Sequence, residues 1–226
     1  MNSPLNTIAM LHTVPGLVSD MEARAQDTVP ALRVLHYVDE SLLHDTIARG
    51  TTPGHVRRRL VNYARYAEES GAQALLVSCS SIGEAATAAQ DFVSIPVLRI
   101  DTPMADLAVA SGGRIGVLAT LSATLGPTTR LVQGSAKRQN KKPTITARKV
   151  DGAFNALRAG DRAMHDTLVL AAFSELAAEC DVVVLAQASM ARVIEQTEDQ
   201  PGGPTVLTSP DSGMTQLSTL FPSKVS

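Results

Sequence analysis

One cysteine stands in a setting suited to acid/base chemistry. Cys79 follows an apolar run that ends at Ser78, and the hydroxyl residues Ser80 and Ser81 come directly after it. Ser81 and Glu84 have the spacing of a helix capping box, which predicts that a helix begins beside the thiol. The free amides and the positive dipole end of such a helix stabilise a thiolate and also bind a carboxylate or enolate oxygen. The sequence therefore predicts a reactive thiol at an anion site, against the alternative of a buried structural cysteine.

Polar and small residues follow other apolar runs in the same way. Imidazole, hydroxyl and amide side chains are the types that hold and orient a small oxygen-containing substrate, and small residues let a ligand approach the backbone. Each hydroxyl by itself is equally suited to capping a helix. Because these residues all follow apolar runs, we expect them to line one substrate site. The predicted substrate-binding residues are His12, Thr13, Ser80, Ser81, Thr120, Ser122, Thr124, Gln187, Ala188 and Ser189.

The second cysteine and the acidic residues are weaker candidates. Cys180 precedes an apolar run instead of following one, which favours structural burial. Asp39 and Glu40 follow an apolar run and suit either a base or the N-terminus of a helix. The histidines lack metal-ligand spacing and no phosphate-binding glycine loop is present, so the residues indicate neither a metal site nor a nucleotide cofactor.

Eight short segments predict the strands that position these residues, since four apolar runs occur in the first half and the second half repeats their plan. They cover residues 7–11, 32–38, 74–78 and 95–100 in the first half, and 114–118, 144–150, 182–186 and 205–208 in the second. Amphipathic segments between them predict helices, including one that opens at Pro53 and one from Asp161 to Ala178. The polar, basic segment from Gln133 to Lys142 is expected to be an exposed loop or a frayed helix end.

This alternation predicts an α/β fold with two pseudo-symmetric halves. Strands that alternate with helices form parallel sheets with right-handed crossovers, so each half should have three α/β/α layers around a mostly parallel four-stranded sheet. The predicted halves are residues 1–102, completed by a C-terminal helix at about 210–226, and residues 103–209. Ligands of such sheets bind beyond the carboxyl ends of the strands. We therefore expect the active site in a cleft between the two halves.

The composition argues against several classes of protein. Of the 226 residues, 44% are hydrophobic but only 3% are aromatic, which is typical of helices packed on parallel strands. A net charge of −2 and a pI near 6.2 provide no basic surface for nucleic acid. The N-terminal apolar stretch lacks a preceding basic residue and is interrupted by His12, Thr13 and Pro15, unlike a signal peptide or a membrane span. We expect a cytoplasmic protein with free thiols and no nucleic-acid or membrane partner.

The chain resembles the aspartate/glutamate/hydantoin racemase superfamily from Ile8 to about Leu220. The resemblance rests on three segments, at residues 79–81, 116–120 and 182–190. It implies cofactor-independent chemistry on a small carboxylate or a related carbonyl compound, a carboxylate-binding role for Thr120, and a homodimer. Racemases of this superfamily place two thiols on opposite faces of an acidic α-carbon, and the second thiol position here carries Gln187. Glutamine is neither an acid nor a base at any useful pH.

The missing second thiol leaves three functions open. The first is an isomerase or racemase-like enzyme that transfers a proton through Cys79, with His12, Asp39 or Glu40 as a candidate second base. The second is a cofactor-free decarboxylase or other lyase with Cys79 as the proton donor, as the related arylmalonate decarboxylases suggest. The third is a non-catalytic carboxylate-binding protein. For an enzyme, the nearby helix N-terminus is expected to lower the pKa of the Cys79 thiol.

Overall fold

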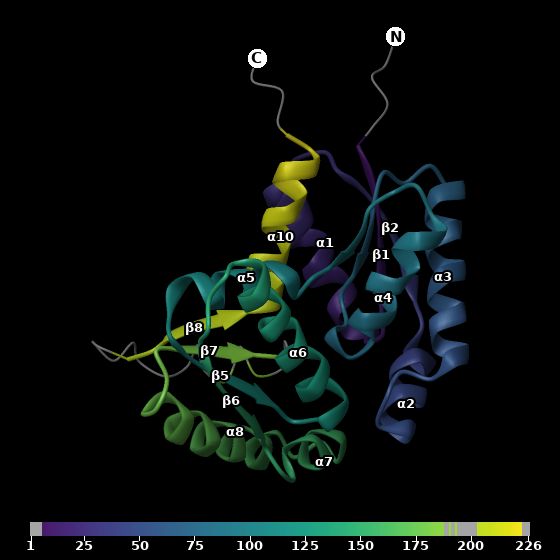
Figure 1. The fold of residues 1–226 in the computed structure, drawn as a ribbon. Helices are drawn as coiled ribbons and strands as arrows, with labels where there is room; N and C mark the ends of the chain where they lie inside the picture. The colour runs from purple at the N-terminus through teal and green to yellow at the C-terminus, as the bar shows by residue number, and fades with distance from the viewer. Residues whose placement is uncertain (1–5, 188–189, 191–192, 194–202, 223–226) are drawn as a thin grey trace. The chain divides into compact units, whose positions relative to one another are not determined.

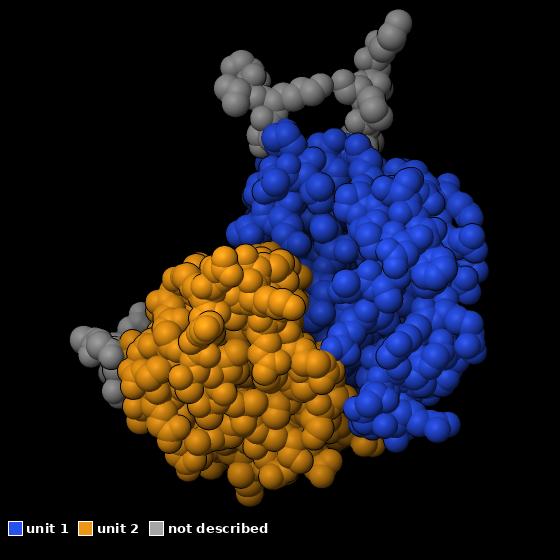
Figure 2. Space-filling view, viewed as in Figure 1, with its two compact units in different colours: residues 1–100, 210–226 blue, residues 101–209 orange. Residues whose placement is uncertain are grey.

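The chain forms two compact units in a computed structural model that describes residues 6–187, 190, 193 and 203–222. One unit comprises Met1–Ile100 and Pro210–Ser226, and the other comprises Asp101–Ser209 (Figure 2). Each unit contains one four-stranded sheet, and every strand pair in both sheets is parallel (Figure 1). The predicted α/β fold with a parallel sheet in each half is confirmed.

The two sheets have the same topology. The first has the order β2-β1-β3-β4, with the strands β1 Thr7–His12, β2 Arg33–Val38, β3 Leu75–Val77 and β4 Val97–Arg99. The second has the order β6-β5-β7-β8, with the strands β5 Arg114–Ala119, β6 Thr144–Lys149, β7 Val182–Leu185 and β8 Thr205–Thr208. All eight predicted strands are present, and the shared order confirms a duplicated α/β unit.

Helices cover both faces of the first sheet. Along β1, Ile8 and Met10 face the helices α1 Val18–Thr28 and α10 Ser209–Leu220. Ala9 and Leu11 face the opposite way, toward α3 Gly54–Glu69 and α4 Gly83–Ala89. A third helix, α2 Glu40–Arg49, also contributes Leu42 to this second layer. Because side chains alternate along a strand, one apolar run supplies both cores.

The second sheet is covered in the same manner. Ile115 and Val117 of β5 face α5 Thr102–Ser111 and α6 Ser122–Arg138. Leu118 faces α7 Ala153–Arg158 and α8 Arg162–Ala177 (Figure 1). Short 3-10 turns complete the chain at η1 Pro15–Leu17, η2 Ser80–Ile82 and η3 Gln90–Phe92. Within the described ranges, none of the helices combines the length and the apolar character that a membrane span requires.

The expectation for the basic segment after Val132 is partly wrong. α6 continues to Arg138, so residues 133–138 are helical and only the residues beyond them form a connection to β6. Ser135 and Ala136 are buried, and the Ser135 hydroxyl donates a hydrogen bond to Asp106 of α5. The polar segment is therefore largely the end of a packed helix, in which the small residues Ser135 and Ala136 face inward.

Candidate active site

Cys79 lies directly after β3, at the carboxyl end of the first sheet. β3 pairs in parallel with β1, so the segments that follow these two strands lie side by side. Thr13 comes from the segment after β1, and its side chain faces the Cys79 sulfur together with the backbone amides of Ser81 and Ile82 and the hydroxyl of Ser81. Thr13 and Ser81 are buried. The structure thus brings two of the predicted hydroxyl residues to the thiol.

The helix beside the thiol begins earlier than the capping-box pattern predicts. Cys79 itself occupies the N-cap position of η2, which starts at Ser80 and runs into α4 at Gly83. Ser81 therefore lies inside the first turn and is not the N-cap residue. The Cys79 side chain makes no regular N-cap hydrogen bond to this turn, and sulfur is in any case a weak acceptor. The expected helix start beside Cys79 is nevertheless present.

The pKa of the Cys79 thiol shifts in the direction opposite to the prediction. Burial raises this pKa, and the hydrogen-bonding groups of Thr13, Ser81 and Ile82 offset the effect only in part. The cost of removing a thiolate from water thus outweighs the stabilisation that a few weakly bonded donors supply. At neutral pH the thiol carries its proton, which suits a proton donor better than a base.

His12 belongs to a separate polar group in the first unit. Its Nδ1 lies 3.0 Å from Oγ of Ser78, and its Nε2 lies 3.0 Å from Nδ1 of His36. Burial, followed by repulsion from His36, lowers the pKa of His12 to about 4, so the ring is neutral at physiological pH. Successive side chains alternate along the chain at a strand, so His12 and Ser78 point away from the face that holds Thr13 and Cys79.

Asp39 is held as a helix cap. It occupies the N-cap position of α2, where one carboxylate oxygen accepts hydrogen bonds from the backbone amide of Ser41 at 3.2 Å and its hydroxyl at 2.8 Å. The other oxygen accepts from Arg59 and from the Tyr63 hydroxyl. Burial would raise the pKa of Asp39, but the hydrogen bonds from Ser41 and Tyr63 and the charge of Arg59 lower it overall. This geometry supports the capping interpretation of Asp39 over that of a catalytic base.

In the second unit, Thr120 and Gln187 bind each other. Thr120 follows β5 and is buried, and Gln187 lies beyond the end of the neighbouring strand β7. Oε1 of Gln187 accepts a hydrogen bond from the backbone amide of Thr120 at 2.6 Å and another from its hydroxyl at 2.9 Å. The hydroxyl that the resemblance assigns to a substrate carboxylate is thus already engaged by a side chain of the same unit.

The other predicted residues of the second unit differ in setting. Ser122 and Thr124 both lie in the first turn of α6, where Leu121 is the N-cap residue, so neither hydroxyl caps the helix. Ser122 is exposed and Thr124 is buried. Ala188 and Ser189 lie outside the described residues. Cys180 is buried in the core between β5 and α8, as predicted for a structural cysteine.

The sequence prediction did not include two titratable residues of the first sheet. Arg99 ends β4 and is buried, and its guanidinium lies against Gly83, where an added Cβ would stand 2.5 Å from the guanidinium carbon. His36 lies within β2 and contacts His12. The available signal was similar in both cases, namely a titratable side chain within or at the end of a segment that the sequence predicts to be a strand.

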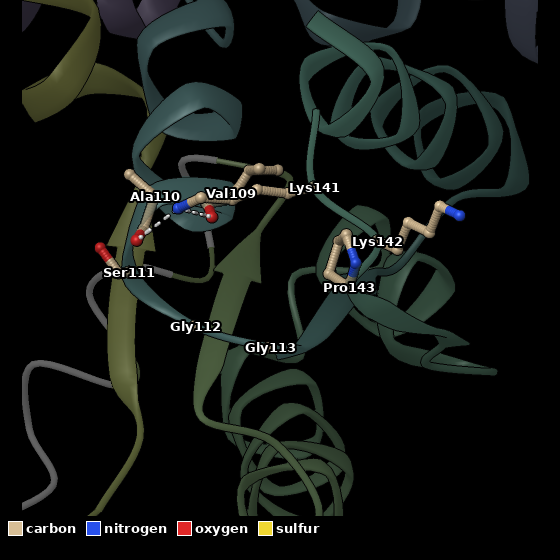
Figure 3. Close-up of a pocket in the computed structure, with 8 residues that line it drawn as sticks. All are labelled: Val109, Ala110, Ser111, Gly112, Gly113, Lys141, Lys142 and Pro143. Atoms are coloured by element: carbon tan, nitrogen blue, oxygen red, sulfur yellow. Dashed lines mark hydrogen bonds between the residues drawn. The ribbon is translucent and has the colours of Figure 1, made fainter. Parts of the chain in front are cut away.

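A pocket of about 300 Å³ in the second unit lies away from these residues (Figure 3). It is lined by residues 109–113 and 141–143, which end α5 and precede β6. It therefore lies at the amino ends of β5 and β6, whereas Thr120 follows the carboxyl end of β5. Nζ of Lys141 donates to the carbonyl oxygens of Val109 and Ala110 at 3.0 Å each, and so stabilises the C-terminus of α5. The part of the chain that the structure describes holds no cluster of His, Cys, Asp or Glu suited to a metal.

Comparisons with known proteins agree with this architecture. A family model described as Asp/Glu/Hydantoin racemase matches residues 11–217. Glutamate racemase isoform RacE1 from Bacillus anthracis superposes with a TM-score of 0.72 at 19% identity, over 97% of this chain and 83% of that one. Aspartate racemase from Picrophilus torridus superposes with a TM-score of 0.69 at 16% identity, over 95% of this chain and 94% of that one. A glycine-to-cysteine mutant of arylmalonate decarboxylase superposes with a TM-score of 0.59 at 18% identity, over 97% of this chain and 94% of that one. A search of curated protein sequences found no match.

Proposed function

We propose, since this chain belongs to the Asp/Glu/Hydantoin racemase family, that it is a cofactor-independent enzyme that transfers a proton at the α-carbon of a small carboxylate or related carbonyl compound. Cys79 carries that proton. The observation that supports this role is the set of hydrogen-bonding groups from Thr13, Ser81 and Ile82 around a single sulfur at a strand tip. A cysteine that served only to fill the core would need none of them.

The local geometry suits a thiol that gives up its proton. When a bond to the substrate α-carbon breaks, its electron pair moves into the adjacent carbonyl and forms an enolate. The S–H proton of Cys79 then passes to the α-carbon, and the enolate returns to a carbonyl. The thiolate that remains is stabilised by the groups of Thr13, Ser81 and Ile82, whose hydrogen bonds strengthen as the sulfur becomes charged.

Isomerisation is the first candidate reaction, because the family and the similar solved structures include glutamate and aspartate racemases. A cofactor-free lyase is the second candidate, and the raised pKa of Cys79 favours it. In a decarboxylation the bond to carbon dioxide breaks first, so a protonated thiol only has to donate. In an isomerisation a base must also remove the α-proton.

The test is a substrate screen in deuterated water. Amino acids, hydantoins, malonates and hydroxy acids are incubated with the protein, and deuterium at the α-carbon is measured by proton NMR. An isomerase incorporates deuterium while it interconverts the enantiomers. A lyase releases carbon dioxide and gives one deuterated enantiomer. A non-catalytic binding protein shows ligand-induced thermal stabilisation without either product.

Two cysteine variants assign the chemistry. Cys79→Ala is expected to abolish turnover while the fold and ligand binding remain. Cys180→Ala is the matched control, because it makes the same change of side chain in the core of the second unit and is expected to retain turnover. Turnover that survives Cys79→Ala refutes the proposed role of this thiol.

A further inference from the structure

The contact between Thr120 and Gln187 orients the Gln187 carboxamide. β5 and β7 are neighbouring parallel strands in which Leu118 pairs with Leu185 (Figure 1). The same register extended by two residues sets Thr120 opposite Gln187, just beyond the carboxyl ends of the strands. Both hydrogen-bond donors of Thr120 converge on one oxygen of Gln187, at 2.6 Å from the backbone amide and 2.9 Å from the hydroxyl.

This arrangement decides which end of the carboxamide is available. A backbone amide can only donate, so the atom that faces it must be Oε1 and not Nε2. The two lone pairs of Oε1 are then both used by Thr120. Nε2 keeps its two N–H donors, and among the described residues it has no hydrogen-bond partner. Gln187 is only partly buried, whereas Thr120 is almost fully covered, so a ligand meets Gln187 first.

We infer that Gln187 Nε2 binds an oxygen atom of the substrate, and that Thr120 is a positioning residue that holds the amide for this purpose. The inference rests on the proposed function, in which the substrate carries a carboxylate or a carbonyl group. It replaces the direct contact between Thr120 and a substrate carboxylate that the resemblance implies, because both donors of Thr120 are already engaged.

The chemical nature of the Gln187 carboxamide limits its role to binding. A neutral carboxamide neither removes nor returns a proton at any useful pH. Gln187 can therefore bind the substrate but cannot act as an acid or a base.

The test compares malonate binding by the full chain and its variants, measured by titration calorimetry. Gln187→Met keeps the length of the side chain but removes the donors, and Gln187→Glu keeps an oxygen for Thr120 while it replaces the donors by a negative charge. Both are expected to weaken malonate binding by about tenfold, and Thr120→Val by a smaller factor, because one of the two contacts that hold the amide remains. Gln26→Met, at an exposed helix position, is the matched control and is expected to bind like the wild type.

Two results would overturn the inference. Malonate that binds Gln187→Met as well as or more tightly than the wild type would show that Gln187 is structural or is displaced by the ligand. A Gln187 side-chain amide resonance that does not respond to malonate in nitrogen-15 NMR would show the same in the wild type. The proposed function fails separately, through turnover that survives Cys79→Ala, so the two failures are distinguishable.

Discussion

Acidification should destabilise the first unit through His12. The ring is fully buried and its pKa is lowered from 6.5 to about 4, so the unfolded chain binds a proton that the folded chain excludes. Above pH 6.5 the titration of His12 does not change the free energy of unfolding. Below pH 6.5 this titration lowers the free energy of unfolding progressively, until the pH falls past the folded pKa of about 4. The gap between the two values corresponds to about 3 kcal/mol in total, of which about 1.4 kcal/mol is lost by pH 5.5 and about 2.5 kcal/mol by pH 4.5.

The neighbours of His12 explain why the proton is excluded. His36 lies 3.0 Å away, so a second positive charge would face the first. Glu22 lies 3.8 Å from the far nitrogen of His36 and not beside His12, so it does not compensate directly. His12→Gln keeps a polar side chain of similar size but cannot titrate. Between pH 7 and pH 4.5, the free energy of unfolding of this variant is expected to fall by about 2.5 kcal/mol less than that of the wild type.

The assay is urea unfolding followed by tyrosine fluorescence. The chain has no Trp, and its three tyrosines, Tyr37, Tyr63 and Tyr66, all lie in the first unit, so this signal reports the unit that contains His12. His44→Gln, at an exposed position of the same unit, is the control and should follow the wild type. If the wild type and His12→Gln lose the same free energy of unfolding over this range, His12 is not a buried neutral imidazole and the reasoning is refuted.

Three substitutions test the packing. Gly116→Ala should destabilise the second unit by about 1–3 kcal/mol in urea unfolding followed by circular dichroism, because the new Cβ would lie 2.6 Å from Cγ of Leu176. Gly213→Ala should cost about 2 kcal/mol or more, because its Cβ would lie 2.6 Å from the backbone carbonyl oxygen of Ile100, which cannot rotate aside; a wild-type unfolding midpoint would contradict this. Asp39→Asn should cost about 1–3 kcal/mol by tyrosine fluorescence and leave turnover intact, since its hydrogen bonds hold a helix start; full stability with lost turnover would point to a catalytic role.

The fold could be predicted because its signals are local. A strand buried on both faces must be apolar at nearly every position, so apolar runs marked the central strands β1, β3, β5 and β7. The errors occurred where a tertiary contact decides the outcome. The outer face of α6 has the polarity of a loop, and only the packing of Ser135 and Ala136 shows that it is helical. The start of the helix beside Cys79 likewise depends on how the chain leaves β3.

By itself, the sequence determined the chemistry that each strand tip can offer: a thiol with hydroxyls at residues 79–81, and an amide, Gln187, at the position where the resemblance places a second thiol. Only the tertiary structure decided how these groups behave. The pKa of Cys79 rises because burial, which depends on the whole unit, outweighs nearby donors. The Gln187 amide is oriented by Thr120, 67 residues earlier in the chain. Desolvation and hydrogen bonding act through space, so residues that are distant in sequence set the pKa of the thiol and the orientation of the amide.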